Sequence, residues 1–460
     1  MPEEIGELAA ALRSGELTAE RLLDRSMERI ARLDPTLNSF VALNEAEARQ
    51  AARDSDARLA AGAARSALEG IPTSIKDNIL VRGMPATWGS RGLADFVPDR
   101  DELPVARLRQ AGAVILGKTN VPELTLEGYT RNDLFGTTRN PWNPALTPGG
   151  SSGGAAAGVA AGLVPAAVGT DGGGSIRRPA SHTGLVGWKP STGHIPRVWG
   201  FPAILTDFEV VGTLTRTVAD ARLLDSVMQG PDQRDRRSLL ADAGGWPERR
   251  RRVLYVPQFS GPVDPEVASA TAAFAGMLAE TGAEVVRGEL FFDLDSVNRI
   301  WRVVTRAGVA YLMDWRDGSL ASGAGESVRA MAEDGRTITG AAYLDALERV
   351  AALRLQLTSV FADYDLVLTP SAAALPWPAE KAYPDRIAGQ PAGPRDHAIF
   401  TAWANIAGLP AISLPVAVSE ERLPIGVQLV AGFGRDAALL GLADELARLS
   451  PPPPLPNGAE

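Results

Sequence analysis

Two glycine-rich segments of the chain each carry a serine suited to covalent chemistry. Residues 147–158 read TPGGSSGGAAAG and contain Ser151, and residues 169–180 read GTDGGGSIRRPA and contain Ser175. A serine hydroxyl becomes a useful nucleophile only when a neighbouring base removes its proton, and N–H groups beside it can stabilise an oxyanion. Glycines also tolerate positive φ and let backbone approach a ligand closely. The two segments therefore indicate acyl transfer at a glycine-lined site.

Phosphate binding and a flexible linker are the other interpretations of such glycine runs. Neither serine-bearing run fits a phosphate-binding loop or a dinucleotide fingerprint with a ribose-binding acid downstream. A flexible linker is expected to have low-complexity flanks, whereas these runs are flanked by strand-like and helix-like segments. Catalysis remains the interpretation that accounts for serines and glycines together.

The base that activates a serine could be a lysine or a distant histidine. Lys76 lies in GIPTSIKDNI, a strand-like run ending in polar residues, and is one of only four lysines among 46 basic residues. Lysine ordinarily titrates near about 10.4, so it can accept a proton near neutral pH only if burial or a nearby cation lowers its pKa. No histidine sits in a G-x-S-x-G elbow, and one that meets a serine only in space stays an alternative. The candidates are His182, His194 and His397.

Composition narrows the classes of partner. The net charge of −9 argues against a general surface for nucleic acid or anionic membrane, and the absence of cysteine excludes a thiol nucleophile. The start of the chain, MPEEIGEL, lacks the features of a secretory leader, and no stretch is long and apolar enough to span a membrane. We therefore expect a cytoplasmic enzyme that acts on a small molecule, as a monomer or homodimer.

The elements that must position these residues alternate along the chain. Leucines at helical spacing predict helices over residues 3–60, with Thr18 at an N-cap. Helices are also predicted at 265–281 and 342–362, and residues 249–252, RRRR, are interpreted as a solvated loop. Strand-like runs occur at 113–116, 165–168, 185–188, 253–256, 366–368, 411–414 and 427–430. This alternation is typical of an α/β protein.

Three segments together resemble the amidase signature family. They are IPTSIKDN around Lys76, GGSSGG around Ser151 and GTDGGGSIR around Ser175. The resemblance extends through GKTNVPE, TTRNPW, GLVGWKPS and GLPAISLP, and so covers most of the chain. It implies a single α/β/α domain over 1–450, with a large mixed sheet flanked by helices. Within it we expect a helical lead-in at 1–65, a signature core at 66–220 and a variable mouth at 230–360, followed by a disordered proline-rich tail at 451–460.

The resemblance also implies a role for each motif residue. Ser175 is expected to attack the carbonyl, Ser151 to relay its proton after a cis peptide bond, and neutral Lys76 to accept it and then protonate the leaving nitrogen. The expected oxyanion hole is made by the N–H groups of Gly172, Gly173, Gly174 and Ser175. The expected supporting residues are Ser152, through a hydrogen bond to the lysine, Asp171 and Arg177.

Two residues depart from the family pattern. Relatives commonly carry a larger residue where this chain has Gly172, so the loop is expected to be more mobile or to leave extra room near the acyl group. Arg178 follows the arginine of the family motif, and it could bind an acidic substrate or pair with a carboxylate. Structural pairing is the favoured interpretation.

The predicted reaction is hydrolysis of an amide, anilide, ester or carbamate through an acyl-enzyme, with no metal or cofactor. The resemblance includes aryl-acylamidase and carbamate-cleaving members. Aromatic walls are predicted from Trp88, Tyr129, Trp199, Phe201 and Trp301. One alternative is the amidase-like glutaminase component of a tRNA-dependent amidotransferase, active only with its partners. Another is a non-catalytic binding protein that retained the fold.

Overall fold

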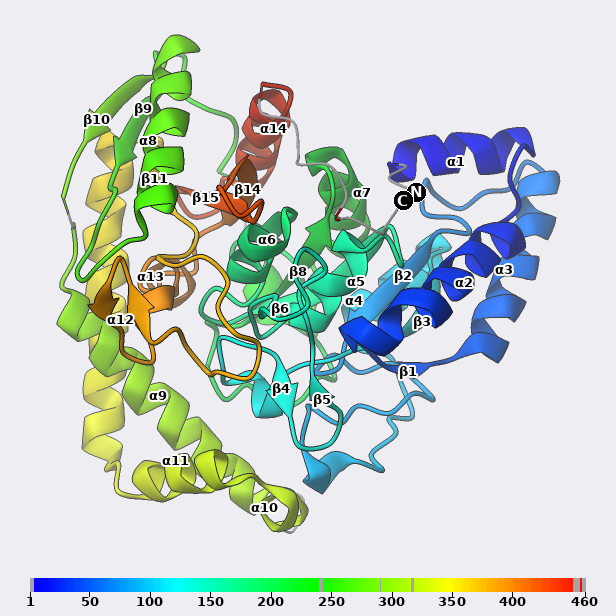
Figure 1. The fold of residues 1–460 in the computed structure, drawn as a ribbon, viewed down its shortest axis with the longest axis horizontal. Coiled ribbons are helices and arrows are strands. Elements are labelled where there is room, and N and C mark those ends of the chain that lie inside the picture. The colour runs from blue at the N-terminus through cyan, green and yellow to red at the C-terminus, as the bar shows by residue number, and fades with distance from the viewer. Residues whose placement is uncertain (1–3, 240–242, 290, 316–317, 450–455, 457–460) are drawn as a thin grey trace.

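An eleven-stranded sheet runs through the protein in the computed structural model, which describes residues 4–239, 243–289, 291–315, 318–449 and 456 (Figure 1). In spatial order the strands are β1 (Phe40–Leu43), β3 (Val114–Thr119), β2 (Pro72–Lys76), β6 (Ala166–Asp171), β8 (Val210–Thr215), β7 (Val186–Lys189), β14 (Ala411–Val418), β15 (Pro424–Ala431), β11 (Leu366–Pro370), β9 (Arg252–Tyr255) and β10 (Glu284–Arg287). Parallel and antiparallel pairs both occur, which confirms the predicted α/β fold with a large mixed sheet.

The parallel strands β3, β2 and β6 position the chemistry. Lys76 stands opposite Thr119 of β3, and Ile75 stands opposite Val168 of β6. Because parallel strands present their carboxyl ends at one edge of a sheet, Lys76 at the end of β2 lies near the segment that follows β6. That segment is the glycine run that leads to Ser175.

Helix α5 (Gly153–Ala160) follows the first serine run and consists only of glycine, alanine and valine, all buried. A Cβ on Gly154 would lie 2.4 Å from the backbone nitrogen of Asn120, so only glycine lets the helix approach that closely. The small residues of this segment therefore hold the serine loop against the sheet.

The N-terminal segment forms helices α1 (Ile5–Ser14), α2 (Ala19–Leu37) and α3 (Glu45–Ala60), which lie together beside β1 and β3 (blue in Figure 1). The Thr18 hydroxyl accepts from the Arg21 N–H, which confirms the predicted N-cap. The prediction of helix throughout 3–60 was wrong at β1, which pairs with β3. Its four residues, FVAL, are too few to show a period.

The remaining helices cover the sheet and the mouth of the site. They are α4 (Leu103–Ala111), α6 (Arg177–Thr183), α7 (Val218–Met228), α8 (Pro265–Glu280), α9 (Leu294–Asp314), α10 (Ser319–Gly323), α11 (Glu326–Arg336), α12 (Gly340–Asp363), α13 (Ala402–Ile406) and α14 (Asp436–Ala447). Helices α9, α11 and α12 pack side by side and build the region expected to vary (Figure 1). The predicted helices at 265–281 and 342–362 are confirmed as α8 and α12.

All seven predicted strands are present, while β1, β8 and β10 of the eleven-stranded sheet were not predicted. The interpretation of 249–252 as a solvated loop is confirmed for Arg249 and Arg250, which are exposed and outside any helix or strand, although Arg249 pairs with Asp365 at 2.8 Å. It was wrong at Arg252, which begins β9. The predicted disordered tail at 451–460 lies outside the described residues, apart from Pro456. Across the described ranges, no helix has the length and apolar character needed to cross a bilayer.

Candidate active site

Lys76 ends strand β2 with a side chain that is completely buried. Its Nζ lies 2.8 Å from Ser151 Oγ, 2.9 Å from Thr170 Oγ1 and 3.2 Å from the Thr170 carbonyl oxygen. In the described part of the chain no carboxylate lies within ion-pair distance of this amine. Two hydroxyls and a carbonyl are therefore its polar partners.

Burial lowers the pKa of Lys76 to about 7, because a desolvated ammonium loses the hydration that stabilises its charge. The carboxylates of Glu209 and Asp171 act in the opposite direction. At neutral pH a substantial fraction of the amine is uncharged, and its lone pair can accept a proton from Ser151.

The first serine run brings Ser151 to the lysine and joins the two loops. The Gly150–Ser151 peptide bond is cis, and a Cβ on Gly150 would lie 2.5 Å from the carbonyl oxygen of Tyr129. The Ser152 N–H donates to the Ser175 carbonyl at 3.1 Å. The Ser152 hydroxyl donates to the Thr170 carbonyl at 3.1 Å, so the expected direct bond to the lysine is replaced by a shared acceptor.

Ser175 follows a glycine turn that the Asp171 carboxylate shapes. Gly174 has φ of +110°, a conformation that favours glycine, and its N–H donates to Asp171 at 2.7 Å. The prediction that Gly174 contributes to the oxyanion hole was therefore wrong, because its donor is already occupied. Among the described residues, the N–H groups of Gly172, Gly173 and Ser175 have no protein acceptor, and they remain as donors.

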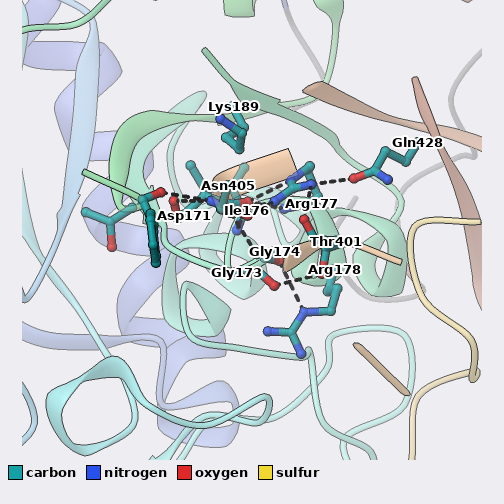
Figure 2. Close-up of polar contacts among 12 residues, drawn as sticks. Asp171, Gly173, Gly174, Ile176, Arg177, Arg178, Lys189, Thr401, Asn405 and Gln428 are labelled. Carbon is teal, nitrogen blue, oxygen red and sulfur yellow. Dashed lines mark hydrogen bonds and ion pairs between the residues drawn. The ribbon is translucent and has the colours of Figure 1, made fainter. Parts of the chain in front are cut away.

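Asp171 and Arg177 form a fully buried ion pair at 2.8 Å behind this turn (Figure 2). The guanidinium also donates to the Thr401 carbonyl at 3.2 Å and to the side-chain oxygens of Gln428 and Asn405. Although burial alone would raise the pKa of Asp171, the Arg177 charge and hydrogen bonds hold it well below its ordinary value. The carboxylate stays ionised and fixes the turn, which fits the expected supporting roles of both residues.

The active-site cavity has a volume of about 740 Å³ and is lined by Ser175, Gly172 and Gly173 together with residues of α9 and of the loop before α13. This is ample for an aryl amide. In the described ranges no cluster of three or more His, Asp and Glu side chains could hold a metal ion.

Only one of the five predicted aromatic residues lines this cavity. Trp301 does so from α9, against Gly173. Trp88 and Phe201 stack on each other at 4.6 Å and border a smaller cavity of about 100 Å³. Trp199 is 41% exposed with Arg234 over its ring, and Tyr129 contributes its backbone carbonyl beside Gly150 instead of a cavity wall.

Gly172 does not leave the extra room expected of it. A Cβ at this position would lie 2.6 Å from Leu205 Cδ1, so the leucine already occupies the space a larger residue would need. Leu205 also lines the cavity. Sequence reasoning missed this residue, as it missed Thr170, whose place within the second serine motif was the available signal.

The three histidines have other partners. His182 Nε2 contacts the Ala374 carbonyl at 3.1 Å, His194 Nε2 contacts Asp225 at 2.9 Å, and His397 Nε2 contacts Arg178 at 2.9 Å. Burial lowers the pKa of His182 to about 4 and that of His397 well below its ordinary value. Lys76 is accordingly the better-placed base.

Comparison with known proteins agrees with this geometry. The Amidase family model matches residues 21–440. A glutamyl-tRNA(Gln) amidotransferase subunit from Prochlorococcus marinus (strain MIT 9303) is 36% identical, with 95% of this chain and 96% of the relative covered. Among solved structures, a bacterial aryl acylamidase of the amidase signature family has a TM-score of 0.90 at 27% identity, covering 98% of this chain and 96% of its own.

A 6-aminohexanoate cyclic dimer hydrolase has a TM-score of 0.85 at 27% identity, covering 98% of this chain and 97% of its own. The corresponding amidotransferase subunit from Thermotoga maritima has a TM-score of 0.73 at 29% identity, covering 95% of this chain and 94% of its own. The family match spans most of the sequence and includes all three motif residues. This chain belongs to the amidase signature family of amidohydrolases.

Proposed function

We propose that the chain hydrolyses amide-type C–N bonds through an acyl-enzyme on Ser175. Ser175 Oγ attacks the substrate carbonyl while its proton passes to Ser151, and the Ser151 proton passes to neutral Lys76. The oxyanion accepts hydrogen bonds from the remaining N–H donors of the glycine turn. The C–N bond then breaks, the proton held by Lys76 returns through Ser151 to the leaving nitrogen, and water cleaves the acyl ester by the same route.

The contact between Lys76 and Ser151 carries this proposal. A fully buried amine 2.8 Å from a hydroxyl, with no carboxylate in ion-pair contact across the described residues, is held in a place that favours its neutral form. Lys189 is also fully buried and outside ion pairs among the described residues, but its amine donates to the Pro190 carbonyl, so the serine hydroxyl is what sets Lys76 apart. Proton transfer accounts for the arrangement.

Aryl amides, anilides and aryl carbamates are the proposed substrates. Trp301 offers an aromatic wall beside the glycine turn, and the cavity is large enough for a ring on either side of the scissile bond. The similarity to an aryl acylamidase supports the same class. Esters with good leaving groups should enter by the same path.

Replacing the nucleophile tests the proposal. Ser175→Ala should lower kcat/KM for 4-nitroacetanilide on the order of 10⁴-fold or more, since groups that act as one unit fail together. Ser226→Ala, at a hydroxyl on α7 that bonds the Leu223 carbonyl, is the control and should retain activity. Intact-mass spectrometry with a slow O-aryl carbamate, whose phenol leaves as the C–O bond breaks, should show a carbamoyl adduct that peptide mapping places on Ser175. An adduct on another residue, or turnover retained by Ser175→Ala, would refute the assignment.

The glutaminase component of a tRNA-dependent amidotransferase is the second candidate, favoured by the 36% identity to one of the subunits of such an enzyme. Such a component would be inactive on anilides and would release ammonia from glutamine only with its partners. Assaying the purified chain alone on 4-nitroacetanilide and on L-glutamine separates the two. Anilide turnover by the isolated chain would favour the amidase.

A further inference from the structure

The adjacent arginines Arg177 and Arg178 point in different directions (Figure 2). Arg177 is saturated by Asp171 and the side chains behind the turn. Arg178 instead lines the active-site cavity while being only 6% exposed. Its Nε contacts the Gly174 carbonyl at 3.4 Å, so the guanidinium is anchored one residue from the nucleophile.

Arg178 lacks the carboxylate partner that was expected of it. Within the described ranges, no acid lies within ion-pair distance, and its Nη1 contacts His397 Nε2 at 2.9 Å. Because an arginine can only donate, His397 must accept at Nε2, which requires the neutral ring. Burial, which disfavours the imidazolium, acts in the same direction. A neutral histidine thus orients the guanidinium without neutralising it.

A second cation faces the same cavity. Arg395, in the loop before α13, lies over the Trp301 ring at 4.6 Å from its centroid and lines the cavity wall. Burial, followed by the charge on Arg395, lowers the pKa of Arg178 to about 9. Both guanidinium groups line one cavity and carry the same charge, and a bound anion would relieve their repulsion.

Among the described residues, the other charged groups that line the cavity form no ion pair with Arg178 or Arg395. Glu209 is in an ion pair with Arg197 at 2.7 Å, and Arg299 and Arg306 of α9 pair with acids outside the cavity lining. Arg302 is exposed on the same helix, where water can solvate its charge. Glu127 lines the wall without entering an ion pair among the described residues, although Arg395 and Arg178 both counter the rise that burial causes in its pKa. Arg178 is therefore a buried cation and Arg395 an exposed one, and the acids of the lining that stand outside ion pairs among the described residues are Glu127 and the exposed Asp295.

We propose that Arg178 and Arg395 form a binding site for a substrate carboxylate beside Ser175, so that preferred substrates are amides that carry a negative charge. Guanidinium groups bind carboxylates through charge-assisted, often bidentate hydrogen bonds. This inference rests on the proposed function for its reaction, because the anion site shares a cavity with the proposed nucleophile. The carboxylate can belong to the acyl group or to the leaving amine.

Matched substrate pairs distinguish these two positions. Succinyl-4-nitroanilide is compared with butyryl-4-nitroanilide for the acyl side, and 4-acetamidobenzoate with acetanilide for the leaving side. In at least one pair kcat/KM for the charged substrate should exceed that of the neutral one on the order of tenfold or more. Equal or lower values in both pairs would overturn the proposal.

Variants assign the preference to these residues. Arg178→Gln and Arg395→Gln should each reduce the charged-to-neutral ratio of kcat/KM about tenfold, mainly through KM, with partial recovery in Arg395→Lys. Arg336→Gln is the matched control, since that arginine pairs with Asp314 and does not line the cavity, and it should keep the ratio. A ratio that falls equally in the control would count against the site.

A binding measurement separates this inference from the proposed function. Calorimetry with Ser175→Ala protein should show that succinyl-4-nitroanilide binds about tenfold more tightly than butyryl-4-nitroanilide, and that Arg395→Gln abolishes the difference. Selective binding without turnover in the wild type would sustain the anion site while the reaction assignment failed. Turnover of neutral anilides by the wild type, without tighter binding of the charged anilide, would support the proposed reaction and overturn the anion site.

Discussion

The surroundings of Lys76 and Lys118 differ although the two lysines lie on neighbouring strands and are both completely buried. Lys118 forms an ion pair with Asp77 at 3.2 Å, whereas Lys76 contacts the hydroxyls of Ser151 and Thr170. Burial lowers the pKa of both amines, but Asp77 counters that effect at Lys118. Burial alone therefore does not distinguish the two lysines, and the difference between them is that Lys76 contacts a serine of the proposed proton relay whereas Lys118 contacts a carboxylate.

The Lys118 segment also carries a misleading pattern. Residues 112–119, GAVILGKT, match the letters of a phosphate-binding loop. In the structure Gly112 caps the end of α4, the rest of the stretch leads into and forms the buried strand β3, and the lysine pairs with Asp77. A short motif needs its loop geometry before it indicates a ligand.

Between the two lysines, the larger effect on activity should follow from removing the amine at Lys76. Lys76→Met should lower kcat on the order of 10³-fold or more while the protein stays folded, because the amine is the proposed proton acceptor and methionine fills a similar volume. Steady-state kinetics with circular dichroism and thermal melting checks both parts. If Lys76→Met kept activity within tenfold of the wild type, the proposed role of this amine as proton acceptor would be contradicted.

The same substitution at the neighbouring lysine should act on stability instead. Lys118→Met leaves Asp77 buried without its counter-charge, a change that costs about 3–5 kcal/mol in comparable buried pairs. Urea unfolding measures the loss, and the double variant Lys118→Met with Asp77→Leu should recover much of it. A single variant as stable as the wild type would show that the pair contributes little.

The dependence of kcat/KM on pH should also distinguish the two lysines, with a smaller expected effect. The active form of Lys76 is neutral, so kcat/KM should rise about tenfold per pH unit below the pKa of about 7 and level off above it. A catalytic ammonium would give the opposite slope. The measurement uses a neutral anilide from pH 5.5 to pH 9, with Lys118 unable to account for the rise while it remains paired.

The sequence was sufficient to predict that Lys76 and Ser151 lie together, and to predict most strands, because motifs and apolar runs are local features of the chain. The N-cap at Thr18 and the lysine at a strand end were predictable for the same reason. Strand β10 was not, since its half-buried residues, EVVR, differ little from a loop in composition.

The residues that line the cavity could not be predicted from the sequence, because they depend on how distant helices pack. Nothing local distinguishes Trp301, which faces the nucleophile loop, from Trp88, which stacks on Phe201. Leu205 and Arg395 reach the site from separate loops, and only the folded chain brings them together. The sequence shows two adjacent arginines, but only the structure shows that Arg177 pairs with Asp171 while Arg178 lines the cavity.

The buried Arg177 cluster ties the catalytic turn to the far end of the polypeptide. Its partners Thr401, Asn405 and Gln428 belong to the last part of the described chain, while Lys76, Ser151 and Ser175 all occur before residue 176. During synthesis on the ribosome, the turn lacks these anchors until strand β15 has emerged. A nascent or prematurely terminated polypeptide would therefore carry the three proposed reacting groups without the frame that aims them, and we expect hydrolysis only once the chain is nearly complete.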